Sequence, residues 1–164
     1  MTLYRDAFTN DLVLSDAHPI TPVAGGFVYE VRPADRDAFL RYFRLKPTSF
    51  AKKDYMAHIK TYLNVLKGEL SRNHPEEVPA FTSCTSAWVK EVLGGFDDYH
   101  FFTGISQDSE SGLVILAKDS EDGQHLTLHY LRNGLKAETA DPNVDPWAGY
   151  EEIPEESFTD ELTE

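Results

Sequence analysis

The sequence has little that would support a disulfide, a membrane span or a cysteine-rich metal site. Cys84 is the single cysteine in 164 residues, so no internal disulfide can form and a zinc site built mainly from cysteine is excluded. No run of about 18 apolar residues is present, which excludes a membrane-spanning helix. The first residues, MTLYRDAFTNDLVLSDA, lack the basic and apolar regions of a secretory signal, so we expect a cytoplasmic protein.

Basic residues are also scarce, at 15 against 28 acidic ones, and the formal net charge is −13. The imbalance is uneven along the chain. Residues 32–72 hold ten basic and four acidic residues, whereas residues 138–164 hold ten acidic residues and no basic one. Such a chain would be repelled overall by a phosphate backbone, so we do not expect general nucleic-acid binding.

What is present is an ordered alternation of strand and helix patterns. Short strands are predicted before residue 32, with LYRD, LVLSD and FVYEV as the clearest, followed by a loop at RPADRD and an ambiguous segment at 38–45. Apolar residues at helical spacing then predict a long helix with Ser49 as its N-cap; they are Tyr55, Ile59, Tyr62, Leu63, Leu66 and Leu70.

A second helix is predicted from about Val78 to Leu93, so the two helices form a hairpin spanning about 49–94. Three strands follow, YHFFTG, GLVILAKD and HLTLHYLR, separated by turn-forming residues. Strands, then a helical pair, then strands indicate an α+β fold in which the helices cover an apolar sheet face.

The chain divides by composition into a folded domain, residues 1–137, and an acidic tail, residues 138–164, which we expect to be flexible. Within the tail, Trp147 and Tyr150 stand among acidic residues, a pattern typical of a short binding segment. One hypothesis is that the tail folds back onto the basic segment 32–72 and anchors an aromatic side chain there. The alternative is plain disorder.

Three stretches together resemble the translationally controlled tumour protein (TCTP) family. They are MTLYRD near the start, TSFAKKDYMAHIKTYLNVLKGEL followed by HPEEVPAF, and a set of aromatic residues that ends at glycine and is followed by NGL: Phe96, Tyr99, Phe101, Phe102, Gly104 and Asn133–Leu135. The resemblance covers nearly all of residues 1–137. It implies a two-sheet core with a projecting helical hairpin, related to small zinc-containing proteins that bind Rab GTPases. It also implies partners such as small GTPases, tubulin and calcium.

The chain departs from the family pattern in three places. About six residues, Arg32 to Asp37, stand where the family has a long acidic loop, and Leu12 and Ile105 stand where the family tends to have glutamate. The resemblance places Asp11, Leu12, Asp16 and Ile105 on a partner-binding rim. If Leu12 and Ile105 are exposed, they add apolar area to that rim; the alternative is that both pack locally.

Other candidate sites are weaker. Lysines on the long helix form a basic surface that is either a site for an acidic partner or an ordinary solvated face: Lys52, Lys53, Lys60 and Lys67. No histidine spacing predicts a metal site, and DSEDG at 119–123 lacks the ligand pattern of a calcium loop, which leaves weak calcium binding by surface acids. We interpret Cys84 as structural, because a thiol catalyst usually has a resolving partner.

The sequence therefore predicts an interaction protein without catalysis or cofactor, which binds a small GTPase or a cytoskeletal partner such as tubulin. A second hypothesis is an acidic calcium-binding or stress-chaperone-like protein without a dedicated pocket. A third, an oxidoreductase that uses Cys84, is disfavoured for the reason given above.

Overall fold

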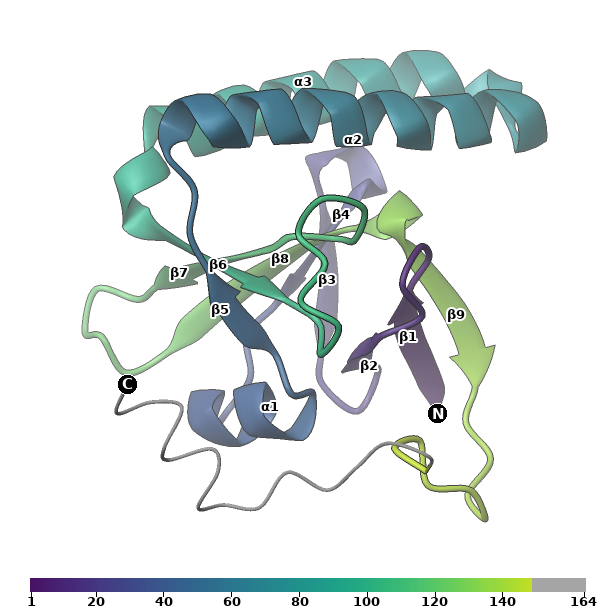
Figure 1. Cartoon of the computed structure of the whole chain (residues 1–164), viewed down its shortest axis with the longest axis vertical. Coiled ribbons are helices and arrows are strands. Elements are labelled where there is room, and N and C mark those ends of the chain that lie inside the picture. Colours follow the sequence, from purple (N-terminus) through teal and green to yellow (C-terminus); the bar gives the residue numbers. More distant parts are fainter. Residues whose placement is uncertain (149–164) are drawn as a thin grey trace.

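The computed structural model describes residues 1–148 as two antiparallel sheets, a helical hairpin and one short helix (Figure 1). The smaller sheet has the order β2-β1-β9, from strands Leu12–Ser15, Thr2–Asp6 and Leu135–Thr139. The larger sheet has the order β3-β4-β8-β7-β6-β5, from strands Ile20–Val23, Val28–Val31, Leu126–Leu131, Ile115–Asp119, Tyr99–Thr103 and Lys46–Thr48. The predicted α+β class with a mostly-β two-sheet core is confirmed.

Side chains from both sheets form one hydrophobic core. The hydroxyl of Tyr130, on β8, is fully buried and donates to the carbonyl of Val13 on β2 at 3.0 Å, which ties the larger sheet to the smaller one. The buried Asp6 carboxylate accepts the backbone N–H groups of Phe8 and Leu113 at 2.8 and 2.7 Å, so it joins the β1–β2 turn to the segment before β7.

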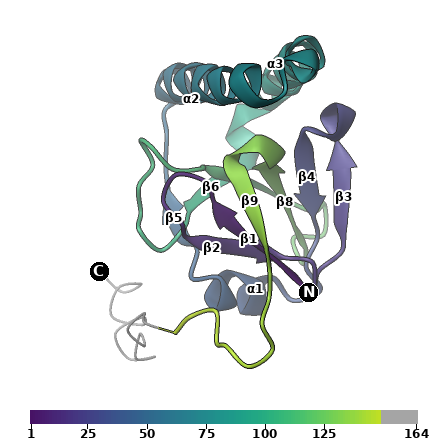
Figure 2. The same ribbon diagram turned by 90° about the vertical axis from the view of Figure 1, so that its right-hand side faces the viewer.

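The helical hairpin lies at one end of the molecule, across the larger sheet (Figures 1 and 2). Helix α2 spans Lys52–Asn73 and α3 spans Val78–Gly94, joined by a single 3₁₀ turn at Pro75–Glu77. The buried face of α2 repeats at helical spacing, as predicted: Tyr55, Ile59, Tyr62, Leu66 and Leu70. Aromatic rings of α2 and β6 meet below it, with Tyr55 and Phe101 5.3 Å apart between centroids.

The start of α2 differs from its prediction. The N-cap is Ala51, without a side-chain hydrogen bond, and Ser49 lies outside the helix. The reason is that residues 46–48 form strand β5, which pairs with β6 from Lys46↔Thr103 to Thr48↔Phe101. Residues 49–51 are therefore needed to connect an edge strand to the helix.

A short helix, α1, spans Arg36–Tyr42 at the end of the molecule opposite the hairpin (Figure 1). The segment 38–45, whose pattern was ambiguous, is therefore mostly helical, and the helix begins inside the predicted RPADRD loop. The Asp35 carboxylate caps it by accepting the N–H of Ala38 at 3.0 Å, and Phe39 is its buried residue. The helix ends at Tyr42 with Phe43 as its C-cap, and the next residue, Arg44, has a left-handed φ of +53°.

The predicted boundary between domain and tail, at residue 137, falls inside a strand. Strand β9 continues to Thr139, with Leu3 paired to Glu138 and Thr2 to Thr139. Trp147 is only 7% exposed, so the chain stays attached to the core well past the predicted boundary. Among residues 1–148, no helix combines the length and the apolar character that crossing a bilayer requires.

Candidate binding groove between α3 and the larger sheet

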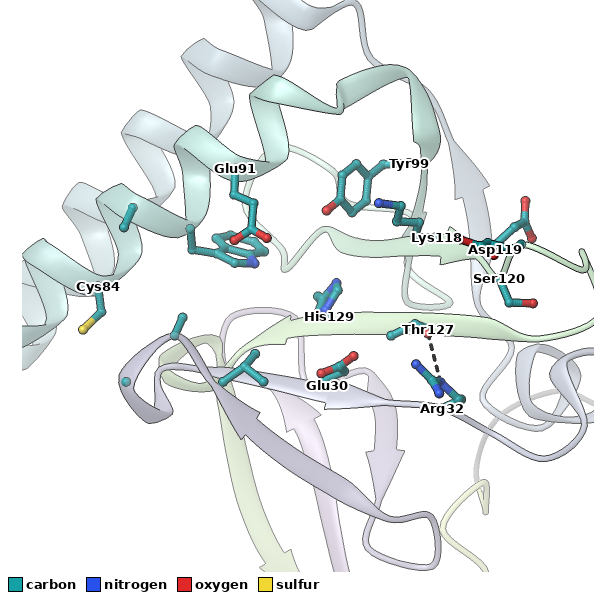
Figure 3. Close-up of a pocket in the computed structure, with 16 residues that line it drawn as sticks. Glu30, Arg32, Cys84, Glu91, Tyr99, Lys118, Asp119, Ser120, Thr127 and His129 are labelled. Atoms are coloured by element: carbon teal, nitrogen blue, oxygen red, sulfur yellow. Dashed lines mark hydrogen bonds between the residues drawn. The ribbon is translucent and has the colours of Figure 1, made fainter.

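A cavity of about 690 Å³ lies where α3 passes over the larger sheet (Figure 3). One wall comes from α3, with Cys84, Trp88 and Glu91. The floor comes from the sheet strands and from the residue that follows β4, with these polar or aromatic side chains: Glu30, Arg32, Tyr99, Lys118, Thr127 and His129. We call this cavity the groove.

Strand alternation explains why the floor is polar. On β8, Leu126, Leu128 and Tyr130 are buried, whereas Thr127 and His129 project from the other face. The pairing of β4 with β8 places Glu30 directly opposite His129. On α3, Trp88 and Glu91 are three residues apart and so lie on one face of the helix.

The inner part of the groove combines two carboxylates with an imidazole. Burial lowers the pKa of His129, although the charges of Glu30 and Glu91 raise it and Lys118 lowers it slightly further. His129 is therefore neutral at pH 7, and its buried Nδ1 has no hydrogen-bond partner within residues 1–148. In the same part of the chain neither the Glu30 carboxylate nor the Glu91 carboxylate makes a hydrogen bond or an ion pair, so two negative charges near His129 are not directly neutralised.

The cations of the groove lie towards its outer part. Arg32 donates from Nε to the Thr127 hydroxyl at 3.3 Å, and the Nζ of Lys118 lies 5.6 Å from the centre of the Tyr99 ring. Figure 3 shows Glu91 on the helix side of the groove and Glu30 on the sheet side, with Arg32 farther along the sheet, and Trp88 also lines the groove. The arrangement favours a positively charged group at the inner end, near an aromatic face.

Cys84 has a packing role at the end of the groove. A Cβ on Gly25 would lie 2.5 Å from the Cys84 Sγ, and Gly25 has a φ of +67°, so the glycine lets the 3₁₀ turn at Ala24–Gly26 rest against α3. This agrees with the structural interpretation of Cys84.

A possible metal cluster lies elsewhere. Within residues 1–148, the one group of three ligand side chains close enough to share an ion is His74, Glu76 and Glu77, at the α2–α3 link. His74 and Glu76 already approach each other at 3.5 Å, and Glu77 pairs with Arg132 at 3.4 Å. Nothing in this exposed cluster distinguishes it from ordinary surface ion pairs.

The structure changes the predicted rim at two of its four residues. Leu12 is fully buried and Asp11 is 4% exposed, so neither side chain can face a partner, and the expectation that they do is wrong. All four residues of β2 are buried because the strand is covered on both faces. Asp11 instead accepts hydrogen bonds from the backbone N–H and the hydroxyl of Ser106, the former at 3.2 Å.

The other two rim residues remain accessible. Asp16 is exposed and accepts the N–H of Thr2 at 2.9 Å. Ile105 is partly buried and packs against the core, beside the turn that Asp11 holds. The alternative of local packing therefore applies fully to Leu12 and partly to Ile105.

The predicted lysines all lie exposed on α2: Lys52, Lys53, Lys60 and Lys67. Lys53, Lys60 and Lys67 are seven residues apart and form a stripe along the helix. Trp147 contacts the segment that follows α1, where the Cζ of Arg44 is 4.4 Å from its ring centre. The tail thus contacts the basic segment through Arg44 rather than through these lysines; Tyr150 lies outside the described residues.

The residues of the groove were not predicted. The sequence offered two signals: polar residues at alternate positions of HLTLHYL, and a glutamate three residues after Trp88. They do not reveal that β4 and β8 are neighbours, which is what brings Glu30 to His129.

The fold and the groove define a class of small α+β protein in which a helical hairpin covers part of an antiparallel sheet. A model of the translationally controlled tumour protein family matches residues 37–136. Translationally-controlled tumor protein homologs from Kluyveromyces lactis and Schizosaccharomyces pombe are each 32% identical to this chain, over 84% of its length and 99% of theirs. The chain belongs to the TCTP family, as the sequence resemblance implied.

Solved structures of TCTP proteins agree with this family assignment. The S. pombe protein, described as translationally controlled tumor-associated protein p23fyp, matches with a TM-score of 0.75 at 32% identity, covering 85% of this chain and all of that one. The TCTP of Caenorhabditis elegans matches with a TM-score of 0.66 at 21% identity, which supports the fold alone. The family model ends at residue 136, so the segment that carries Trp147 lies beyond its match.

Proposed function

We propose that this chain is a non-catalytic, cytoplasmic binding protein that receives a basic side chain of a protein partner in the groove. The observation that carries the proposal is the inner end of the groove. There, Glu30 and Glu91 lie near a neutral His129, and neither carboxylate has a hydrogen-bonding or ion-pair partner within residues 1–148. An arginine or lysine of a partner would supply the missing positive charge.

The chemistry favours a long cationic side chain over a small ion. The methylene groups of an arginine or lysine would lie along Trp88, and the charged end would reach the carboxylates. A cation over an aromatic face gains about 0.5–2 kcal/mol, depending on how far water is excluded. The net charge of −13 would also speed the approach of a basic partner surface.

For the partner itself, the family resemblance points to a small GTPase or to a cytoskeletal protein such as tubulin. A GTPase with a basic surface would use the groove, with exposed Asp16 as a second acidic contact. An acidic segment, such as a tubulin tail, would instead bind the stripe of Lys53, Lys60 and Lys67. The two partners therefore require surfaces of opposite charge.

The groove can be tested directly with N-acetylarginine amide as probe, followed by NMR titration of the full chain. We expect shifts of the Trp88 indole and His129 imidazole signals, and about tenfold weaker binding in Glu30→Gln and Glu91→Gln. Glu110→Gln, an exposed change with the same loss of charge, is the control. If all three variants bind the probe equally weakly, the loss of affinity comes from the change in net charge alone, which would contradict the proposal.

The partner class can be tested with purified proteins on a biosensor. If a small GTPase is the partner, binding should fail in the Glu30→Gln/Glu91→Gln double variant and persist in Lys53→Gln/Lys60→Gln/Lys67→Gln. Tubulin should show the reverse pattern. A partner that is insensitive to both variants would exclude both surfaces.

Weak calcium binding is a second candidate, favoured by the excess of 28 acidic over 15 basic residues. Calcium bound by scattered surface carboxylates would raise the melting temperature only slightly at millimolar concentration. A tight site would raise it strongly with concentration by mass action, so a thermal titration with calcium distinguishes the two.

A further inference from the structure

Residues 140–148, which we call the strap, follow β9 and turn back beneath the molecule towards the end that carries α1 (Figures 1 and 2). Two similar turns shape the strap. The carboxylate of Asp141 accepts the N–H of Asn143, and the carboxylate of Asp145 accepts the N–H of Trp147, both at 2.9 Å. Each aspartate precedes a proline, so local chemistry orders the strap without much burial.

One side chain anchors the strap. Residues 141–145 and Ala148 are exposed, whereas Trp147 is 7% exposed and belongs to the hydrophobic core cluster. A segment with so few buried contacts opens at a small fraction of the cost of global unfolding. The strap can therefore leave its site while the domain stays folded.

Two arginines frame the site of Trp147, which we call the tryptophan socket. The Arg44 guanidinium lies over the indole, with its Cζ 4.4 Å from the ring centre. Arg5 donates from Nη2 to the Pro146 carbonyl at 3.4 Å, from Nη1 to the Asn10 carbonyl at 3.2 Å and from Nε to Glu138 at 2.6 Å. Glu138 belongs to β9, so this ion pair holds Arg5 in place, while the socket itself contacts an indole and a backbone carbonyl of the strap.

Arg44 and the strap differ in their relation to the family model. Arg44 lies inside the segment that the family model matches, residues 37–136, whereas the strap lies beyond it. Asp141 and Asp145 accept N–H groups of their own turns, and they give the strap a formal charge opposite to that of the two arginines. The occupant seen in the structure therefore shows which chemistry the socket accepts.

From these contacts we infer that the socket is a docking site for a short acidic, tryptophan-bearing segment of a protein partner. In the resting chain the strap occupies this site as an internal competitor. A partner segment of the same chemistry binds when the strap leaves. This site is independent of the groove and of the proposed function, and it fits a partner of the opposite charge.

The test uses the full chain and a labelled peptide with the strap sequence DPNVDPWA. In Trp147→Ala the socket is vacant, so we expect the variant to bind the peptide at least about tenfold more tightly than the native chain, whose tethered strap competes at high effective concentration. The same peptide with alanine in place of tryptophan should not bind. Added salt should weaken the complex, because part of the recognition is ionic.

A matched variant isolates the contribution of Arg44. Its φ of +53° is a backbone conformation that glycine favours, so Arg44→Gly removes the guanidinium without straining the chain. In the Trp147→Ala background this change should weaken peptide binding about tenfold, as expected when a desolvated cation–π contact is lost. Lys60→Gln, at an exposed position of α2, serves as the control for lost charge.

Circular dichroism and thermal melting establish that each variant is folded. If Trp147→Ala does not fold, the Trp88→Phe variant can be labelled with 5-fluorotryptophan, so that Trp147 is the single labelled residue. Excess peptide should then shift the Trp147 fluorine signal. A folded Trp147→Ala chain that binds no peptide, or equal binding with Arg44→Gly, would overturn the inference. So would concentration-dependent dimers of the native chain, since the strap would then fill the socket of a second copy.

Discussion

Replacing Gly104 with alanine tests the most specific packing statement that the structure makes. A Cβ built on Gly104 would overlap the Asp11 carboxylate Oδ2, and would lie 2.5 Å from the Asp11 Cβ and 2.8 Å from its Cγ. Gly104 has no positive φ, so the requirement for glycine is one of space rather than of backbone conformation. This explains why the aromatic strand β6 is followed immediately by glycine.

The expected cost combines two terms. Forcing a methyl group into a filled site costs about 1–3 kcal/mol, and displacing the Asp11 carboxylate weakens its hydrogen bonds to Ser106, which costs about 1 kcal/mol more. We therefore expect Gly104→Ala to lower the free energy of unfolding by about 2–4 kcal/mol. Urea denaturation followed by circular dichroism measures this as a shift of the midpoint by about 1–2 M.

Gly94→Ala is the matched control. Gly94 ends α3 and has no atom within 4 Å of the position that a Cβ would take, so alanine there should be neutral or stabilise the helix by up to about 1 kcal/mol. A Gly104→Ala midpoint equal to that of Gly94→Ala would refute the reasoning.

A double-mutant cycle identifies Asp11 as the obstacle. In an Asp11→Gly background both the carboxylate and the Cβ that meet residue 104 are gone, so Gly104→Ala should cost at least about 1 kcal/mol less than in the native chain. An unchanged cost would mean that another group limits the space at residue 104.

Three further predictions concern stability. Burial lowers the pKa of His18, His58 and His129, so the unfolded chain takes up protons at a higher pH than the folded chain does. The free energy of unfolding therefore falls as the pH drops below 6.5, by up to about 1.4 kcal/mol per pH unit for each histidine. His58→Gln should make the urea midpoint depend less on pH between pH 7 and 5. Asp6→Ala leaves buried N–H groups unpaired and should cost about 2–4 kcal/mol by the same denaturation assay, with Asp16→Ala at an exposed position as the comparison. Tyr130→Phe removes the inter-sheet hydrogen bond and should cost about 1–2 kcal/mol, and a neutral result would show that this bond does not hold the sheets together.

The helical hairpin was predictable because its signal is local. Tyr55, Ile59, Tyr62, Leu66 and Leu70 repeat at 3.6-residue spacing, and α2 buries them as a single face. Strand β5 was not predictable from three residues that include Pro47, because only pairing with β6 makes them a strand. A strand at the edge of a sheet tolerates proline, but the sequence does not show which strand lies at the edge of the larger sheet.

The burial of Leu12 shows how a family comparison can mislead about a single position. Placing Leu12 on a rim relied on the residue that relatives have there. The continuous apolar run Leu12–Leu14 is instead typical of a strand covered on both faces, and all three residues are buried. The residues around the position therefore indicated burial, whereas the substitution alone indicated exposure.

Trp147 is a different case: its acidic surroundings and large apolar side chain gave the hypothesis of an anchor, and the structure buries this side chain to 7% exposure. The predicted attachment to the basic segment is met by Arg44, but the second arginine of the socket, Arg5, lies in the first strand and outside that segment. The net charges of the segments indicated that the acidic tail and the basic segment 32–72 attract each other. They did not show which cations the fold brings within reach of residue 147, because β1 and β9 become neighbours only in the folded sheet.

The groove and the socket lie on different parts of the fold and select opposite charges. The groove lies beneath α3 and presents unpaired carboxylates, whereas the socket lies towards the α1 end and presents arginines (Figures 1 and 3). A partner bound in one site therefore leaves the chemistry of the other unchanged, unless the strap itself reaches across. Because the strap begins where β9 ends, residues 140–148 remain near the socket even when Trp147 leaves it. The two sites should thus be separable by mutation, with Trp147→Ala opening the socket and Glu91→Gln closing the groove.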